Sequence, residues 1–109
     1  MGDRVSISFK KNGQESVALF CHWGGTWLPK RARNYVKELK RDIKSNKDLV
    51  TWPLGRLEPD TVMVDFIRDL HDQGELTYGS NKRVLSNYYL GRDEHDGDNS
   101  DNGHFVIEL

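Results

Sequence analysis

The stretch "VSISFKKNGQESVALFCH", residues 5–22, predicts a β-hairpin and decides the class of fold. Apolar and polar residues alternate from Val5 to Phe9, as they do in a strand with one buried face. The pair Asn12-Gly13 follows, and this pair favours the tight turn that joins two antiparallel strands. The returning segment from Ser16 to His22 carries apolar side chains on both faces, so we expect it to lie in the centre of a sheet.

Two amphipathic helices are predicted after the hairpin. Pro29 suits the first turn of a helix between Leu28 and Lys47, and Pro59 with Asp60 opens the second, for which Gly74 is a suitable stop. In both segments apolar residues recur three or four positions apart, which places them on one helical face. These residues are Ala32, Val36, Leu39 and Ile43 in the first helix and Val62, Met63, Phe66, Ile67 and Leu70 in the second.

Two further strands are predicted, from Val84 to Leu90 and from His104 to Leu109, with an acidic loop between them. The element order is then β-β-α-α-β-β. This order predicts an α+β domain in which two helices cover one face of an antiparallel sheet of about four strands. We expect residues 1–109 to form a single domain, because a chain of 109 residues suffices for one core.

Composition narrows the class of protein. The chain is 36% hydrophobic and 30% charged, which is typical of a globular domain with a small core. A lone cysteine, Cys21, excludes an intramolecular disulfide and a cysteine-rich zinc ribbon. No apolar run is long enough to cross a bilayer, and the segment after Met1 is polar, so we expect a soluble, cytoplasmic protein that does not associate with membranes.

Charge is separated along the chain, although the net charge is only −1. Residues 30–47 hold eight basic and two acidic residues, whereas residues 93–109 hold six acidic residues and no lysine or arginine. Basic residues in the first helix form a stripe beside the apolar face, which could bind an acidic protein, a second copy of the chain, or nucleic acid. The residues of this stripe are Arg33, Lys37, Lys40, Lys44 and Lys47.

The acidic loop "HDGDNSDNGH", residues 95–104, offers oxygen ligands for a calcium ion. Its second half does not fit the helical calcium loop, because the closing glutamate position falls on Leu109. Histidines offer a second metal hypothesis, a transition-metal site in which His22 approaches the loop. The candidate ligands are His22, His95, Asp96, Asp98, Asp101 and His104, and a divalent metal is the only cofactor that the sequence suggests.

The segment "CHWGGTW", residues 21–27, is a candidate ligand loop. Two glycines before a helix allow the backbone to turn tightly and present amides to an anion, and tryptophans offer stacking surfaces. The alternative is a simple strand-to-helix turn whose tryptophans pack on the core. The candidate residues are His22, Trp23, Gly24, Gly25 and Trp27.

The first quarter of the chain resembles a group of small uncharacterised phage and prophage-associated proteins, in which two strands lead into a Cys-His-Trp-x-Gly segment. The matching residues are Arg4, Gly13, Phe20, Cys21, His22, Trp23 and Gly25. The chain departs from that pattern at Gly24, where the group has an acidic residue, and at Thr26 and Trp27. The resemblance implies a small accessory protein of a mobile element, which favours a binder or inhibitor over an enzyme.

Three hypotheses on function follow. The first is a non-enzymatic interaction module whose basic helix and acidic C-terminal loop are complementary patches for a protein partner or for self-association. The second is a metal-binding protein that uses the loop from His95 to His104 together with His22. The third is a weak nucleic-acid binder that uses the basic helix.

Overall fold

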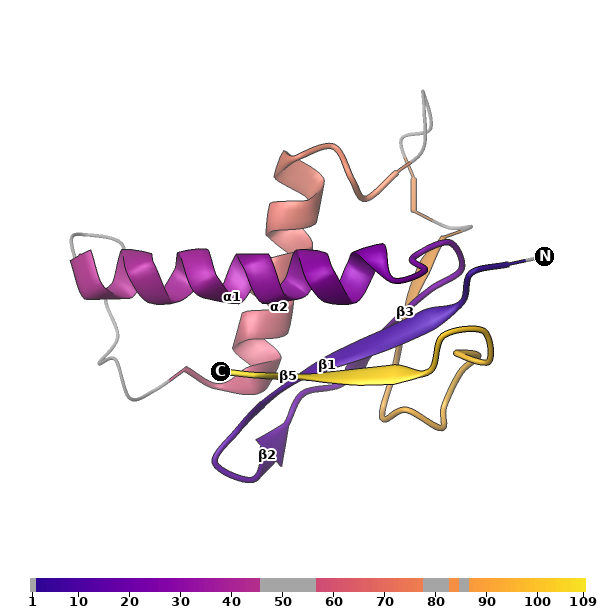
Figure 1. Ribbon diagram of the computed structural model, residues 1–109, viewed down its shortest axis with the longest axis horizontal. Helices are drawn as coiled ribbons and strands as arrows, with labels where there is room; N and C mark the ends of the chain where they lie inside the picture. Colours follow the sequence, from indigo (N-terminus) through magenta and orange to yellow (C-terminus); the bar gives the residue numbers. More distant parts are fainter. Residues whose placement is uncertain (1, 46–56, 78–82, 85–86) are drawn as a thin grey trace.

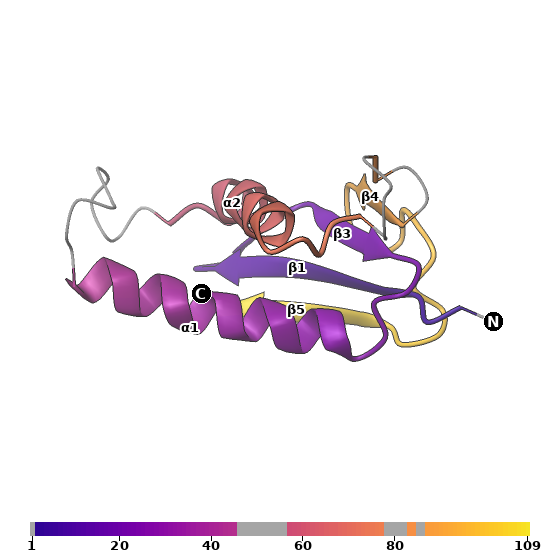
Figure 2. The same cartoon turned by 90° about the horizontal axis from the view of Figure 1, so that it is seen from above.

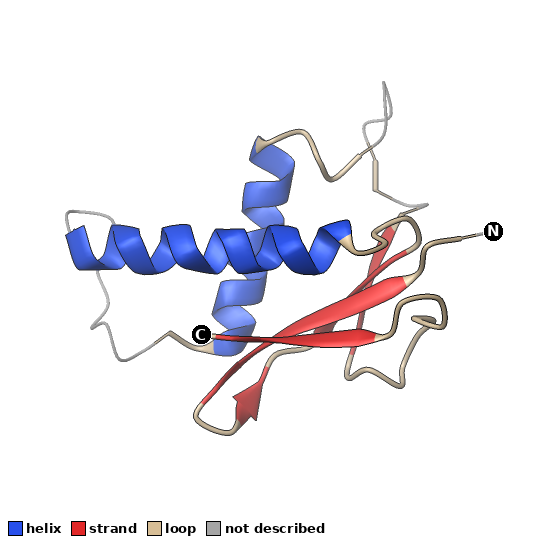
Figure 3. Ribbon diagram, in the orientation of Figure 1, coloured by secondary structure: helices blue, strands red, loops and turns tan. Residues whose placement is uncertain are grey.

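The computed structural model describes residues 2–45, 57–77, 83–84 and 87–109, and these residues form the predicted α+β domain (Figure 1). The strands and helices follow one another in the order expected from the sequence (Figure 3). The elements are β1 (Val5–Lys11), β2 (Gln14–Glu15), β3 (Ala18–Cys21), α1 (Trp27–Ser45), α2 (Pro59–Asp72), β4 (Tyr88–Gly91) and β5 (His104–Glu108).

The hairpin forms as predicted. Asn12 and Gly13 adopt φ of 52° and 84°, which is the backbone geometry of the tight turn that Asn-Gly favours. The returning strand is interrupted at Ser16, whose hydroxyl accepts a hydrogen bond from the backbone N–H of Phe9 at 2.9 Å. One strand was therefore predicted where the structure has two, β2 and β3, both paired with β1.

The sheet has β1 and β3 at its centre, and the central place of β3 was predicted from the apolar side chains on both faces of the returning segment. β3 lies between β1 and β4, and β5 pairs with the other edge of β1. The pairs β1–β2, β1–β3 and β3–β4 are antiparallel, which confirms the predicted arrangement, and β5 adds one parallel pair with Ser6 opposite His104. The parallel direction arises because the chain crosses from β4 at one edge to the outer side of β1 before β5 begins (Figure 1).

Both helices cover the same face of the sheet, and the core lies between the two layers (Figure 2). Alternation along β1 directs Val5, Ile7 and Phe9 toward the helices, and all three are fully buried. The predicted apolar faces of both helices are confirmed, with Leu39 and Ile67 only partly buried. One large core side chain, Tyr35 of α1, was not predicted. The apolar residues from Ala32 to Ile43, spaced by four, three and four positions, already defined a buried helical face without it.

The ends of the elements differ modestly from the predicted ones. Helix α1 begins at Trp27 and is described to Ser45, so Lys47 lies outside the described residues. Helix α2 ends at Asp72, and Gly74 stops it as predicted, with φ of 73° and an N–H that donates to the carbonyl of His71. The predicted strand from Val84 to Leu90 is shorter, since β4 begins at Tyr88.

The opposite face of the sheet is partly covered by the acidic segment between β4 and β5. Phe20 and Tyr89 stack there with ring centroids 5.0 Å apart, and Gly97 lies directly against both rings.

In the described ranges no helix is long and apolar enough to cross a membrane.

Candidate functional site

A row of exposed cations runs along α1, the helix that lies beside the edge strand β5. The row consists of Arg33, Lys37, Lys40 and Lys44, and we call it the basic stripe. Its spacing of four, three and four residues keeps all four side chains on one side of the helix, next to the buried face. Within the part of the chain that the structure describes, no carboxylate pairs with any of them.

Arg31 belongs to the same basic run of sequence but has a structural role. Its guanidinium donates to Asp69 and to Glu75, each at 2.7 Å, and its side chain is only 14% exposed. It also lies over the ring of Phe66 at 5.7 Å, so it joins α1 to α2. Arg31 is not part of the basic stripe, because it precedes Arg33 by two residues and therefore lies about 200° away around the helix.

A shallow groove of about 370 Å³ lies between the basic stripe and β5. Its lining residues are Arg33, Val36 and Lys37 from α1 and Val106, Ile107 and Glu108 from β5. The guanidinium of Arg33 lies 5.8 Å from the ring centroid of Phe105, which holds this side chain over the strand. The groove therefore has apolar side chains at its floor and cations along one wall.

The edge of strand β5 that points away from β1 is unpaired in the described part of the chain. Among the described strands β5 pairs only with β1, through bonds that include Ser6 N–H to Gly103 carbonyl at 3.1 Å and Leu109 N–H to Lys10 carbonyl at 2.9 Å. Backbone groups of alternate residues point to opposite edges of a strand, so those of His104, Val106 and Glu108 point outward. Such an edge is a template for a further strand.

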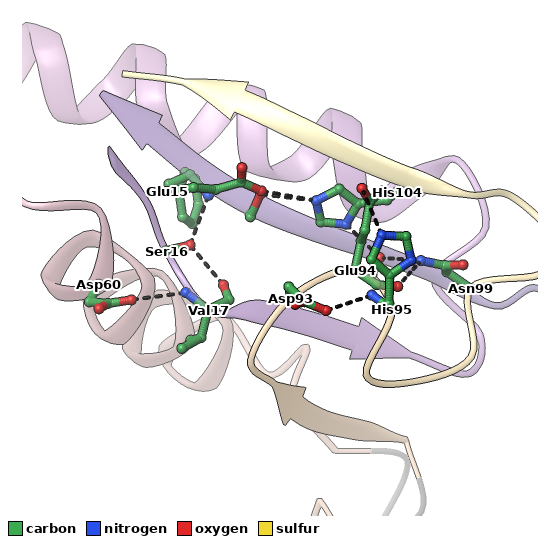
Figure 4. Close-up of polar contacts among 12 residues, drawn as sticks. Glu15, Ser16, Val17, Asp60, Asp93, Glu94, His95, Asn99 and His104 are labelled. Atoms are coloured by element: carbon green, nitrogen blue, oxygen red, sulfur yellow. Dashed lines mark hydrogen bonds and ion pairs between the residues drawn. The ribbon is translucent and has the colours of Figure 1, made fainter. Parts of the chain in front are cut away.

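A polar cluster on the face of the sheet away from the helices was not predicted from the sequence. His104 lies in it with a side chain only 5% exposed, its Nδ1 2.7 Å from the hydroxyl of Ser6 and its Nε2 3.0 Å from that of Ser8 (Figure 4). The Ser8 hydroxyl donates in turn to Glu15. This hydrogen bond lowers the pKa of Glu15 below its usual value, with a further contribution from His104.

The donors and acceptors of this cluster form one continuous chain. The Asn99 amide donates to the Ser6 hydroxyl at 2.9 Å, which leaves the Ser6 hydrogen free for His104 Nδ1. With its hydrogen on Nε2, His104 then donates to Ser8, and every side chain is satisfied. The signal that could have revealed the cluster is the alternation of Ser6 and Ser8 on one side of a strand whose other side is apolar.

The acidic loop is largely neutralised within the chain. Arg4 pairs with Asp98 at 3.1 Å and with Asp101 at 3.5 Å, and Arg92 pairs with Asp96 at 3.5 Å. These contacts fold the loop onto the start of β1. Its acidity therefore stabilises the structure, and the loop is a weaker docking patch than its sequence suggests.

The predicted metal ligands lie apart. His95 is 84% exposed and lies beside Glu94 (Figure 4), whereas His104 is held by the serines. The ring centroid of His22 lies 6.1 Å from that of Tyr89. In the described ranges no three histidine, cysteine, aspartate or glutamate side chains form a group that could hold a metal ion. Asp96, Asp98 and Asp101 take the arginine partners described above.

The candidate ligand loop forms the turn between β3 and α1. Gly24 is needed there for packing, since a Cβ at this position would lie 2.5 Å from a methyl of Val5. Gly25 has φ of 50° and donates its N–H to the carbonyl of Asp3 at 2.8 Å, so this amide is not free for an anion. Trp23 and Trp27 are both exposed and border a pocket of about 300 Å³.

Cys21 also lines that pocket, but its surroundings do not activate the thiol as a nucleophile. It is 2% exposed, and its thiol donates to the side-chain oxygen of Asn87 at 3.4 Å. Burial raises the pKa of this thiol, which disfavours the reactive thiolate.

The fold and these surfaces define the chain as a small α+β domain with a basic stripe beside an edge of β5 that no other described strand covers. No family model, curated protein or solved structure matches it. The resemblance of the N-terminal quarter to phage-associated proteins stays a prediction.

Proposed function

We propose that the protein is a non-enzymatic binding module whose basic stripe engages an acidic protein. The observation that carries this proposal is the difference between two sets of cations. Arg4, Arg31, Arg68 and Arg92 each hold a carboxylate of the chain, whereas the basic stripe is exposed and unpaired among the described residues. Four like charges on one side of a helix repel one another, and an acidic partner relieves that repulsion.

The groove beside the stripe favours a protein over a nucleic acid. The apolar side chains at its floor, Val36 and Ile107, suit peptide side chains better than a phosphodiester backbone. Tyr35, the one aromatic residue between Arg33 and Lys44 in the sequence, is buried in the core, so bases could not stack on it between the cations. The acidic loop does not enter the proposal, because arginines of the same chain take up its carboxylates.

The state of the titratable side chains also supports a binding role. His104 and Cys21 are two side chains whose types serve acid-base or nucleophilic chemistry, and both are buried with their hydrogen-bonding atoms engaged. General acid-base and nucleophilic catalysis both need a group within reach of substrate.

A binding titration with defined polyanions tests the proposal. Fluorescently labelled poly-L-glutamate and a DNA duplex are titrated at low and at moderate salt, with wild type and the Lys37→Glu/Lys40→Glu variant. We expect poly-L-glutamate to bind at low salt, to bind more weakly as salt screens the charges, and to lose affinity for the variant. A control with the same change in net charge, Arg83→Glu/Arg92→Glu, places the reversal on either side of β4, at the edge of the sheet opposite to β5, and should retain binding.

Other outcomes are equally decisive. Binding of the duplex without binding of poly-L-glutamate would replace the proposal with the nucleic-acid hypothesis. A molecular mass that rises with protein concentration and falls with salt would point instead to self-association. No binding of poly-L-glutamate at low salt would end the proposal.

A further inference from the structure

The free edge of β5 and the basic stripe together specify the shape of the partner. The outward backbone groups of His104, Val106 and Glu108 supply three donors and three acceptors in a row along the strand. Helix α1 runs along β5 on the side of the sheet that holds the core, as both ribbon views show (Figures 1 and 2). A strand added at this edge would lie beneath Arg33 and Lys37.

The repeat distances of the two elements match. Residues four apart on a helix are separated by about 6 Å along its axis, and residues two apart on a strand by roughly 6.7 Å. Arg33 and Lys37 are four apart, so side chains at alternate positions of an added strand reach one cation each. Those side chains point toward the helix layer, and carboxylates there pair with the stripe.

The other face of the added strand meets a different surface. Val106 is 40% exposed on the side away from the helices, where a neighbouring apolar side chain would cover it. Glu108 places a carboxylate on that same side and disfavours an acidic neighbour. An added strand is therefore expected to carry acidic side chains on the face toward the helices and apolar side chains on the opposite face.

We propose that the partner binds by strand addition: an extended segment that alternates acidic and apolar residues pairs with the outer edge of β5, its carboxylates facing Arg33 and Lys37. This inference rests on the proposed function and specifies how the basic stripe recognises its ligand. Main-chain bonds supply affinity in this mode of recognition, and the alternate side chains supply specificity.

A second copy of this chain is a poorer occupant of the edge. Antiparallel pairing of two β5 strands about a two-fold axis leaves both α1 helices on the same side of the joined sheet. Their stripes would then face each other across the axis, with Arg33 and Lys37 of each copy opposed by like charges. Repulsion of this kind opposes self-pairing and favours an acidic strand.

Peptides of one composition test the strand geometry. The probe is the capped peptide Glu-Val-Glu-Val-Glu-Val-Glu, compared with a block isomer that holds the same four glutamates and three valines. Two further analogues carry backbone N-methyl groups, one on the three valines and the other on three glutamates. Strand addition uses one edge of the peptide, so one analogue loses up to three hydrogen bonds and should bind at least about tenfold more weakly, while the other binds normally.

Variants of Val106 test the edge from the side of the protein. Val106→Pro removes an outward N–H that makes no bond to β1, a change that edge strands accommodate. It should weaken binding of the alternating peptide by about tenfold. The matched control Val106→Thr keeps the N–H and should bind within about twofold of wild type.

The results separate this inference from the proposed function. Equal binding of the alternating, block and both methylated peptides, with no effect of Val106→Pro, would overturn strand addition and leave the basic stripe as a purely electrostatic site. Failure of every peptide to bind at low salt would overturn both. Should Val106→Pro not fold, the methylated peptides decide the question with wild type alone.

Discussion

The Nδ1 atom of His104 lies 2.7 Å from the hydroxyl oxygen of Ser6, and this contact joins the last strand of the chain to the first. The two residues form a register pair at the point where β5 joins the sheet beside β1. The same imidazole reaches Ser8 through its other nitrogen. The strand whose outer edge carries our binding proposal is thus fixed on its inner side by backbone bonds and by a buried side-chain network.

Replacement of His104 should therefore weaken the whole domain. His104→Ala leaves the hydroxyls of Ser6 and Ser8 buried without this partner, and an unsatisfied buried group costs about 1–3 kcal/mol. We expect the free energy of unfolding to fall by that amount in urea titrations. His95→Ala is the matched control, since His95 is exposed, and its effect should stay within about 0.5 kcal/mol. Equal stability of the two variants would contradict the network.

Arg31 should be the cation of α1 that matters most for stability. Arg31→Ala leaves Asp69 and Glu75 without their shared partner, and removing one side of a largely buried ion pair costs roughly 3 kcal/mol. Arg31→Lys should restore little, because a single ammonium cannot reproduce the two-pronged contact. Thermal unfolding checks this, with the exposed Arg41→Ala as the control. If Arg31→Ala changes stability no more than Arg41→Ala does, the ion pairs of Arg31 do not stabilise the fold.

The sequence predicted the layers of the fold because periodicity and turn chemistry are local. Asn12-Gly13 and the apolar rhythm around Val36 and Phe66 each depend on neighbouring residues, and the structure confirms all three. The direction of β5 could not be predicted, since it depends on where the acidic segment carries the chain after Gly91. Nothing within residues 104–109 distinguishes a parallel from an antiparallel partner.

The same distinction between local and long-range information separates the two candidate patches. The spacing of the basic stripe follows from helical geometry, and its four described cations lie on one side of α1 as expected. The sequence suggested that the acidic loop is an unpaired negative patch complementary to the basic stripe. Its partner Arg4 was not recognised, because it is almost a hundred residues away in the chain. Long-range ion pairs such as Arg4 with Asp101 leave no mark in a single sequence.

The pH dependence of stability should have a contribution from Asp65. Burial works to raise the pKa of Asp65, but hydrogen bonds from Arg68 and from the Tyr35 hydroxyl outweigh it and lower the pKa below the usual value. A carboxyl with a lowered pKa in the folded state stabilises the protein above its unfolded pKa, near 4, and that stability is lost as pH falls through the folded value.

Asp65→Asn should therefore destabilise the protein at pH 7, and its difference from wild type should narrow as pH falls below about 4. Urea unfolding at pH 7, 5, 4 and 3 measures the difference. Asp42→Asn is the control, because Asp42 is exposed on α1 and has no ion pair among the described residues. A difference that stays constant over this range of pH would show that the Asp65 charge does not contribute.

The cover over the far face of the sheet should depend on Gly97. A Cβ at this position would lie 2.7 Å from a ring carbon of Tyr89 and 2.8 Å from one of Phe20, which is too close for any side chain. Because these two rings stack on each other, neither can move aside without disturbing the sheet. Gly97→Ala should therefore lower the free energy of unfolding by about 1–3 kcal/mol, the usual cost of overpacking.

The same substitution at Gly2 serves as the comparison for Gly97. A Cβ there would meet the guanidinium of Arg4 at 3.3 Å, the flexible end of a long side chain, so Gly2→Ala should change stability by less than about 0.5 kcal/mol. Urea unfolding of both variants measures the difference. If Gly97→Ala is as stable as Gly2→Ala, the acidic segment does not pack against the sheet, and the far face of β3 is open to solvent or to a partner.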